Sequence, residues 1–410
     1  MSNKLSLDSK KYILEDVLKY EQPTKYIVKS TNYDDSYNTP VLTAGKSFII
    51  GYTNETEGVC NTLPVIIFDD FTTSSQYVDF PFKVKSSAMK ILHATDEANI
   101  KYLYYLMQTI QHKADTHKRY WISEYSQREI NLPSKYEQNK IVEKIEEEFG
   151  KIDEGVEKLK LAQEQIKQYR QSVLKSAFEG KLYKTTNWVE KQLKTISDVL
   201  GGYAFKSEYY TNNGFQIIRM GNIKPLKINY GEKPVYINNF DTKIIDKYSL
   251  QINDIVITLT GTRKKRDYGY VAIINSNNLL LNQRLARLRF KKDCYPKYFL
   301  YALQSEPFQT KFFSYETGNV GQGNVSIKAI TEEYIDVPTL NEQKQIVAEI
   351  EKRFAIADEA ERIINDNLAN AEQLKQSILK KAFEGRLVPQ DPTDEPASEL
   401  LAKIHAERGT

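Results

Sequence analysis

The sequence predicts an α+β protein in which two globular domains are separated by two long helices that form an antiparallel coiled coil. Three observations lead to this prediction. Two helical stretches recur at a spacing of 205 residues, short apolar runs between them are punctuated by Gly, Pro and Asn, and 410 residues exceed what one hydrophobic core usually serves. We therefore expect an internal repeat of two halves related by a pseudo-twofold axis.

The repeat is clearest in the predicted helices. EQNKIVEKIEEEF at 137–149 matches EQKQIVAEIEKRF at 342–354 in seven shared residues, and SVLKSAFEGKL at 172–182 returns at 377–387 with eight of eleven positions identical. From Val142, apolar or small residues recur in alternating steps of three and four, which is a heptad seam. Because two equal halves in one chain pair most simply about a twofold axis, the helices are expected to be antiparallel.

This organisation divides the chain into five segments. We expect a first globular domain at 1–135, a central spacer helix at 136–182, a second globular domain at 183–340, a C-terminal spacer helix at 341–388, and a tail with a short helix at 389–410.

Each globular domain is expected to contain several short strands and one amphipathic helix. In the first domain the sequence predicts helices at 10–20 and 101–110, strands at 40–52, 63–71 and 77–86, and a polar loop at 112–133 that ends in a last strand. In the second domain it predicts an amphipathic start at 188–210, strands at 215–223, 254–261, 268–275 and 285–290, and a helix at 297–305.

Composition limits the classes of function. A net charge of +3 and a pI near 8.4 mean that any nucleic-acid site must be local. Two distant cysteines make a disulfide framework improbable and favour a reducing cytoplasm. No run approaches 18 apolar residues, so we expect neither secretion nor a membrane span.

Motifs of catalysis are absent from the sequence. It contains no GxxxxGK[ST] loop, no NPPY or DPPY tetrad of an amino-methyltransferase and no HExxH, and its four histidines show no metal-ligand spacing. We expect no catalytic residues and no metal site in this chain.

A basic window marks the second domain. Residues 261–292 contain nine Lys or Arg against Asp267 alone, and the turn GTRKKRDYGY joins two predicted strands. Arg can bind guanine as a fork and Lys suits phosphates, although a charge run alone is equally compatible with a solubilising loop. The candidate DNA contacts are Lys206, Arg219, Asn222, Thr262, Arg263, Lys264, Lys265, Arg266, Tyr268, Gln283, Arg284, Gln322 and Asn324.

The first domain is less basic. Two clusters of polar and basic side chains are its candidate DNA contacts. They are Lys46, Thr72, Thr73, Ser74 and Gln76, and the segment with Lys113, His117, Lys118, Arg119 and Tyr120.

Divergent globular domains on matched spacers suit two targets at a fixed separation. Major-groove faces of DNA recur about every 10 bp, roughly 34 Å, so a symmetric frame converts protein length into half-site spacing. An alternative is a coiled-coil scaffold or adaptor whose basic turn meets an acidic protein, and a self-sufficient nuclease or methylase is disfavoured by the missing motifs.

Several motifs resemble the specificity subunit of type I restriction-modification systems. They are LKSAFEGKL, LKKAFEGRL, GGYAFKSEYY, IIRMGNI, TGNVGQGNVS and LVPQDPTDEPASELL, and together with the layout they cover essentially the whole chain. The first domain has no counterpart of the FKSEYY and Gly-Gln motifs, so its contact residues cannot be carried over motif by motif.

The resemblance implies a non-catalytic subunit that reads double-stranded DNA. Two target recognition domains would each bind half of a bipartite site in the major groove, and the coiled coil would set the gap. Two methyltransferase subunits would dock on the frame, and two restriction subunits can join them. S-adenosylmethionine, ATP and Mg would belong to those partners and not to this chain.

Overall fold

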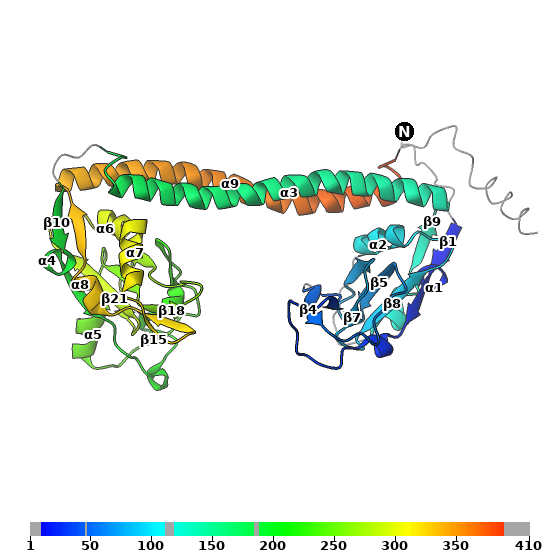
Figure 1. Ribbon diagram of the computed structural model, residues 1–410, viewed down its shortest axis with the longest axis horizontal. Helices are drawn as coiled ribbons and strands as arrows, with labels where there is room; N and C mark the ends of the chain where they lie inside the picture. Colours follow the sequence, from blue (N-terminus) through cyan, green and yellow to red (C-terminus); the bar gives the residue numbers. More distant parts are fainter. Residues whose placement is uncertain (1–9, 46, 111–118, 184–187, 389–410) are drawn as a thin grey trace, which may run out of the picture. The chain divides into compact units, whose positions relative to one another are not determined.

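The structure is a computed structural model and describes residues 10–45, 47–110, 119–183 and 188–388 (Figure 1). The chain divides into two compact units. The first runs up to Leu159 and resumes at Asp366, and the second spans Lys160–Asn365. Both units combine helices with strands, so the α+β class expected from the sequence is confirmed.

The first unit is built on a four-stranded antiparallel sheet with the order β2-β8-β5-β6. A three-stranded sheet, β4-β3-β7, and a two-stranded ribbon, β1-β9, accompany it. Its elements are β1 Lys10–Ile13, α1 Leu14–Val17, β2 Leu18–Glu21, a 3-10 turn Pro23–Tyr26, β3 Thr39–Leu42, β4 Ile49–Thr53, β5 Val65–Asp69, β6 Ser75–Val78, β7 Lys83–Val84, β8 Met89–Ala94, α2 Ile100–Thr109, a π-helical turn Trp121–Tyr125 and β9 Glu129–Leu132.

Strand β5 explains why the apolar run at 63–71 folds as a strand. It lies between β8 and β6, and its first four residues are all buried. Ile66 and Phe68 face the core that includes helix α2, whereas Val65 and Ile67 face a second core. A strand covered on both faces needs no polar alternation, and its apolar run is therefore continuous.

The second unit also contains a four-stranded antiparallel sheet, with the order β11-β21-β17-β19, and a second sheet with the order β15-β12-β20-β16. Strand β18 pairs with the hairpin β22-β23, and β13 pairs with β14. The elements are β10 Val189–Gln192, α4 Leu193–Ile196, β11 Ser197–Gly201, a 3-10 turn Ser207–Tyr209, β12 Phe215–Ile218, a 3-10 turn Met220–Asn222, β13 Ile223–Lys224, β14 Lys227–Ile228, β15 Tyr236–Ile237, α5 Thr242–Tyr248, β16 Ser249–Leu250, β17 Ile255–Thr258, β18 Thr260–Thr262, β19 Val271–Ile273, β20 Leu279–Leu281, β21 Leu285–Phe290, α6 Pro296–Gln304, α7 Glu306–Ser314, β22 Thr317–Gly318, β23 Gln322–Asn324, α8 Ile327–Thr331 and β24 Tyr334–Val337.

The chain enters and leaves each globular part through a two-stranded antiparallel ribbon. β1 pairs with β9 in the first unit, and β10 pairs with β24 in the second, where Val189 lies opposite Val337 (Figure 1). Strand β9 leads into helix α3, Lys135–Phe178, and β24 leads into helix α9, Leu340–Phe383. Each long helix has 44 residues.

Both long helices begin with the same cap. The Ser134 backbone and hydroxyl donate to the Glu137 carboxylate, whose own backbone N–H donates to the Ser134 hydroxyl, and Thr339 and Glu342 repeat this arrangement. Such reciprocal caps satisfy donors that a helix start leaves unpaired.

The repeated AFEG motif is the matching stop signal. The glycines that follow the helices, Gly180 and Gly385, have φ of 71° and 69°. This left-handed conformation is favourable for Gly, and it lets the Lys181 N–H donate to the Ser176 carbonyl at 2.9 Å. The repeated motifs are therefore helix boundaries.

A buried glutamine fixes the start of each long helix against its own globular part. Gln138 donates to the Pro133 carbonyl at 2.9 Å and accepts the Asn99 backbone N–H at 2.7 Å. Gln343 makes the same pair of bonds, donating to Pro338 at 2.9 Å and accepting from Tyr295 at 2.7 Å. The repeated Glu-Gln dipeptide therefore combines a cap with an anchor to the start of an earlier helix, α2 or α6.

In each unit a part of α3 lies beside a part of α9. In the first unit the Lys375 ammonium lies 2.5 Å from the Asp153 carboxylate. In the second, the Arg170 guanidinium binds Asp358 at 2.7 Å and Glu361 at 2.8 Å. Arg170 and Lys375 thus join the two long helices through ion pairs.

Two local predictions were wrong, and one strand was missed. Residues 10–20 form two strands around one helical turn, because Lys10–Ile13 pairs with β9 and Leu18–Glu21 pairs with β8. The sequence analysis missed β8 itself. Within the predicted polar loop, Trp121–Tyr125 forms a π-helical turn whose two aromatic end residues are buried. Strand partners far along the chain decided the first two cases, and burial of Trp121 and Tyr125 accompanies the third.

Candidate nucleic-acid interface

Two adjoining hollows mark the surface of the second unit. Their volumes are about 500 and 610 Å³, and they share Met220, Gly221 and Arg284. The smaller one is also lined by Arg219, Asn222, Glu232, Lys233, Asn282 and Gln283, and the larger one by Ile223, Lys224, Pro225, Thr260, Gly261, Thr262, Asp267, Tyr270, Gly321 and Gln322. We call this surface the groove. Four basic and two acidic side chains line it.

Met220 and Gly221 of the 3-10 turn Met220–Asn222 line both hollows. The Asn222 side chain is 1% exposed and holds this turn from inside. Its oxygen accepts the Arg219 backbone N–H at 2.9 Å, and its amide donates to the carbonyls of Asn229 and Glu232 at 3.0 and 3.1 Å. The turn is therefore fixed before any ligand arrives. Beside it, the Arg219 guanidinium donates to the Lys233 carbonyl at 2.5 Å.

A tight turn after β20 presents Gln283 and Arg284. Arg284 has a φ of 70°, and both side chains are exposed. The Gln283 N–H donates to the Tyr203 carbonyl at 2.8 Å. A Cβ at Gly202 would lie 1.9 Å from the Asn282 carbonyl oxygen, so only glycine permits this approach. Backbone contacts thus point the two side chains outward.

The basic loop follows β18 and contains residues 263–266. Its Arg263 guanidinium binds the Glu316 carboxylate at 2.8 Å, which also accepts a hydrogen bond from the buried Tyr268 hydroxyl. The hydrogen bond from Tyr268, followed by the bond from Arg263, keeps the pKa of Glu316 below its ordinary value. Arg266 packs over the ring of Phe313 at 5.0 Å. Lys264 and Lys265 are exposed.

The hairpin β22-β23 extends the same edge. Strand β23 pairs with β18, so Gln322 lies opposite Thr262 and Asn324 opposite Thr260. Gln322 and Asn324 are exposed, whereas Gly323 between them is buried. A Cβ at Gly323 would lie 2.2 Å from the Tyr268 hydroxyl. The alternation therefore turns both amide side chains to solvent.

The structure brings together five residues that the sequence predicted from four separate segments. Arg219, Thr262, Gln283, Arg284 and Gln322 all line the groove. Asn222 lines it too, but its amide is used inside the protein. Lys206 is exposed, lies near Glu208 at 3.7 Å and does not line either hollow.

Two predicted contacts and part of the predicted charge need correction. Asn222 and Tyr268 are each 1% exposed and bonded within the protein, so we do not carry them into the interface. Arg287 is 4% exposed and bound to Asp198, and Arg289 binds Asp254 at 2.7 Å. The basic window therefore presents fewer free cations than its composition indicates.

Sequence reasoning missed Lys224 and Lys233. They line the larger and the smaller hollow, respectively. Both stand outside the basic window, Lys224 at the end of the short strand β13 and Lys233 in the loop before β15. The only sequence signal was their proximity to the predicted Arg219.

In the first unit, Asp70 joins the two predicted clusters. The backbone N–H of Tyr120 donates to the Asp70 carbonyl, and that of Trp121 to the Asp70 carboxylate, both at 2.9 Å. The Lys90 ammonium is fully buried, 3.6 Å from the same carboxylate. This contact places Arg119, which is exposed, next to the turn that holds Thr72.

The remaining predicted residues of the first unit fall into three groups. Thr73 and Ser74 are half-buried in the turn between β5 and β6, and Gln76 is half-buried on β6. Tyr120 is 3% exposed, so its ring is not available for a contact with DNA and we correct that prediction. Lys46, Lys113, His117 and Lys118 lie outside the described residues.

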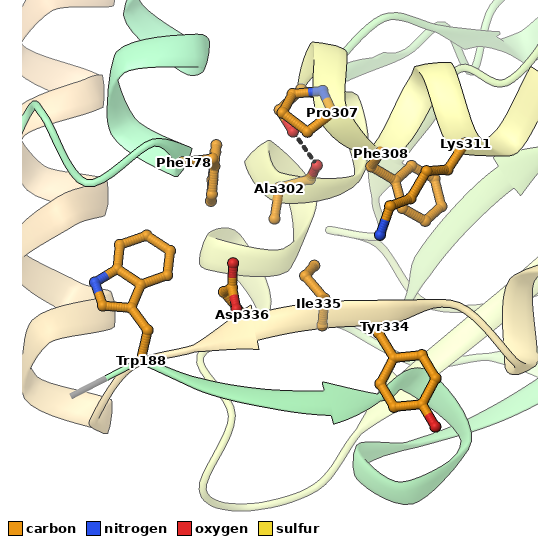
Figure 2. Close-up of a pocket in the computed structure, with 10 residues that line it drawn as sticks. Phe178, Trp188, Ala302, Pro307, Phe308, Lys311, Tyr334, Ile335 and Asp336 are labelled. Carbon is orange, nitrogen blue, oxygen red and sulfur yellow. Dashed lines mark hydrogen bonds between the residues drawn. The ribbon is translucent and has the colours of Figure 1, made fainter.

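Figure 2 shows a smaller hollow of about 80 Å³ in the second unit, where the end of α3 meets α6, α7 and β24. Phe178 and Trp188 lie on one side of it, and Phe308 on α7 on the other. The Phe178 ring packs edge-on against Tyr298 at 5.4 Å, and the Lys311 ammonium binds Glu333 at 2.8 Å. We interpret this hollow as a packing feature of the helix end.

The residues that the structure describes offer neither a metal site nor a membrane-spanning helix. They contain no cluster of three or more His, Cys, Asp or Glu suited to a metal ion. No described helix combines the length and apolarity that crossing a membrane requires. Cys60 and Cys294 are both buried as free thiols.

Comparisons with known proteins identify a family for this chain. Residues 185–369 match the family described as type I restriction modification DNA specificity domain. The specificity subunit of the type I restriction enzyme EcoR124I/EcoR124II of Escherichia coli is 33% identical over 83% of this chain and 85% of its own length. The specificity subunit of the type I restriction enzyme EcoKI, from E. coli strain K12, is 27% identical over 68% of this chain and 64% of its own length.

A solved structure supports the fold. A chain from a study of complex assembly and conformational transition of the type I R-M system has 18% sequence identity and a TM-score of 0.65, covering 94% of this chain and 100% of that one.

Residues 185–369 therefore correspond to a DNA specificity domain. The chain belongs to the family of type I restriction enzyme specificity subunits. These matches confirm the predicted function as a specificity subunit and support it over the scaffold alternative. They also confirm the predicted assignment as the non-catalytic subunit.

Proposed function

We propose that this chain reads a bipartite site on double-stranded DNA with two target recognition domains. Residues 1–135 would form the first and residues 183–340 the second, with spacer helices at 136–182 and 341–388 and a tail at 389–410. The observation that carries this proposal is the groove, where side chains from four segments converge beside the basic loop.

The chemistry of the groove suits a DNA duplex. Arg284 has the donors that bind guanine as a fork, and Gln283 and Gln322 can pair with adenine. Lys224, Lys233, Lys264 and Lys265 can neutralise phosphates, which position a protein without reading sequence. Contacts to bases and contacts to phosphates are made by different elements of one rigid surface, as sequence-specific DNA binding requires.

The two long helices would form an antiparallel coiled coil that sets the gap between the half-sites. The ion pairs of Arg170 and Lys375 with the opposite helix in each unit support this arrangement. A helix of 44 residues is roughly 65 Å long, which is about two turns of DNA at roughly 34 Å each. The matching caps and anchors of both helices support an internal repeat with a pseudo-twofold axis.

Two methyltransferase subunits would bind to this frame, and two restriction subunits can join the complex. S-adenosylmethionine, ATP and Mg would be bound by those partners, where catalysis takes place. A cytoplasmic location is part of this proposal.

The experiment is to produce this chain with its methyltransferase partner and to sequence the methylated DNA. One motif is expected, with two specific halves and a gap of constant length. Arg284→Ala should relax one half only, because Arg284 belongs to the second unit. Lys194→Ala is the control, since this exposed lysine stands on α4 and does not line the groove. A contiguous motif, or relaxation of both halves by Arg284→Ala, would contradict the proposal.

A further inference from the structure

The tip of the hairpin β22-β23 carries the most exposed large apolar side chain of the described residues. Val320 is 87% exposed, and the next in order, Ile356, is 64% exposed. The two strands pair through Gly318 and Gly323, so residues 319–321 form the tip.

Folding gives no reason for a valine at this position. Turns favour Gly, Asn, Asp, Ser and Pro, and the neighbours Asn319 and Gly321 follow this rule. A side chain left in water gains no burial energy. Because single apolar residues are common on protein surfaces, the surroundings of Val320 decide how it is interpreted.

Those surroundings are the side chains proposed to contact DNA. The Arg263 backbone N–H donates to the Gly321 carbonyl at 3.4 Å, which ties the tip to the basic loop. Gly321 and Gln322 line the larger hollow. Val320 is therefore an apolar point within a polar and cationic surface.

The tip is also fixed from below. Strand β23 pairs with β18, and Gly323 packs beneath the Tyr268 hydroxyl. Glu316, directly before β22, accepts hydrogen bonds from Tyr268 and Arg263. A hairpin whose strands are held this firmly loses little conformational entropy when its tip contacts a ligand.

We propose that Val320 is a specificity-determining residue that contacts the C5 methyl group of a thymine in the half-site read by the second unit. This inference rests on the proposed function. A two-stranded β-ribbon fits the major groove, where the thymine methyl is the apolar group that the base edges present. The contact distinguishes thymine from cytosine, which lacks the methyl group.

Replacement of thymine by uracil tests the contact because it removes only the methyl group. The complex of this chain with its methyltransferase partner is titrated with duplexes in which each thymine of the target is replaced in turn, and affinity is measured by fluorescence anisotropy. At one thymine, uracil should weaken binding by the wild-type complex about fourfold, the factor that burial of one methyl group is worth. Val320→Ala should weaken binding to the thymine duplex by a similar factor and abolish the response to uracil. Val189→Ala, an exposed valine on β10, is the control and should keep the full response.

Each outcome decides the matter. The inference is overturned if uracil has no effect at any position, if the half-site contains no thymine, or if Val320→Ala keeps the response. It is also overturned if Val320→Ala weakens assembly with the methyltransferase partner and leaves the response intact. A wild-type complex that binds a duplex of scrambled sequence as tightly as its target would instead refute the proposed function.

Discussion

Removal of Lys264 and Lys265 tests whether the basic loop contacts DNA phosphates. Both lysines are exposed, whereas their neighbour Arg263 is bound to Glu316. Each phosphate contact contributes about −0.9 to the slope of log affinity against log salt. The double variant Lys264→Ala, Lys265→Ala should therefore have a slope that is less negative by about 1.8. Between 50 and 200 mM salt, the affinity advantage of the wild type should shrink roughly twelvefold.

The assay is equilibrium binding of the assembled complex to its own target over a series of salt concentrations. The preferred sequence should stay the same, because phosphate contacts carry no base information. Lys191→Ala combined with Lys194→Ala removes the same charge from β10 and α4 and should leave the slope unchanged. An unaltered slope in the Lys264 and Lys265 variant would refute the phosphate contacts.

Three further predictions concern the frame and the hairpin. Gly150→Ala should raise the free energy of unfolding by about 1 kcal/mol, since this helical glycine has open space around it. Gly180→Ala should lower the free energy of unfolding by about 1 kcal/mol, because Gly180 has a positive φ. Thermal unfolding of both variants checks these opposite signs. Gln343→Leu should lower stability by about 1–3 kcal/mol for each backbone group left unpaired, whereas Leu at the exposed Gln373 should have little effect on the melting temperature. The pKa of Glu316 is lowered, so its stabilising contribution is present above its ordinary pKa and is lost as the pH falls through the lowered value. Glu316→Gln should remove that acid-sensitive part of stability and weaken DNA binding at neutral pH, and an unchanged acid unfolding curve would contradict the hydrogen-bond network.

Helices α2, α3, α6 and α9 and several of the strands could be predicted from local patterns. The heptad seam and the repeated caps are determined by neighbours within a few residues, so α3 and α9 were predicted closely. Apolar runs identified β5 and β17 because both are buried on two faces. Residues 10–20 could not be predicted this way, since their helical spacing is overruled by strands that pair with partners more than 70 residues away.

The groove was predictable as a set of residue types but not as a surface. Arg219, Gln283 and Gln322 were expected from their chemistry, and the fold brings them to one place. The count of Lys and Arg overestimated the exposed positive charge, because some of these residues form ion pairs with partners that are distant in sequence. Arg287 binds Asp198, which lies 89 residues earlier, and no local window includes both.

The first unit gave weaker sequence signals for a different reason. Its two predicted clusters meet through Asp70. In the sequence, Asp70 indicates an acidic residue that would repel DNA, but in the structure its carboxylate is buried beside Lys90. A carboxylate paired with a buried lysine adds no negative charge to the surface, and only the structure reveals that partner.

The proposed function requires two separable readers on one common frame. Because β10 and β24 pair at Val189 and Val337, the second globular part can be exchanged at a single ribbon, replacing residues 189–337 by the matching segment of a relative with a different target. Methylation sequencing of the hybrid complex should show one half-site replaced by that of the donor, with the other half-site and the gap retained. A change in both half-sites, or none, would contradict the account.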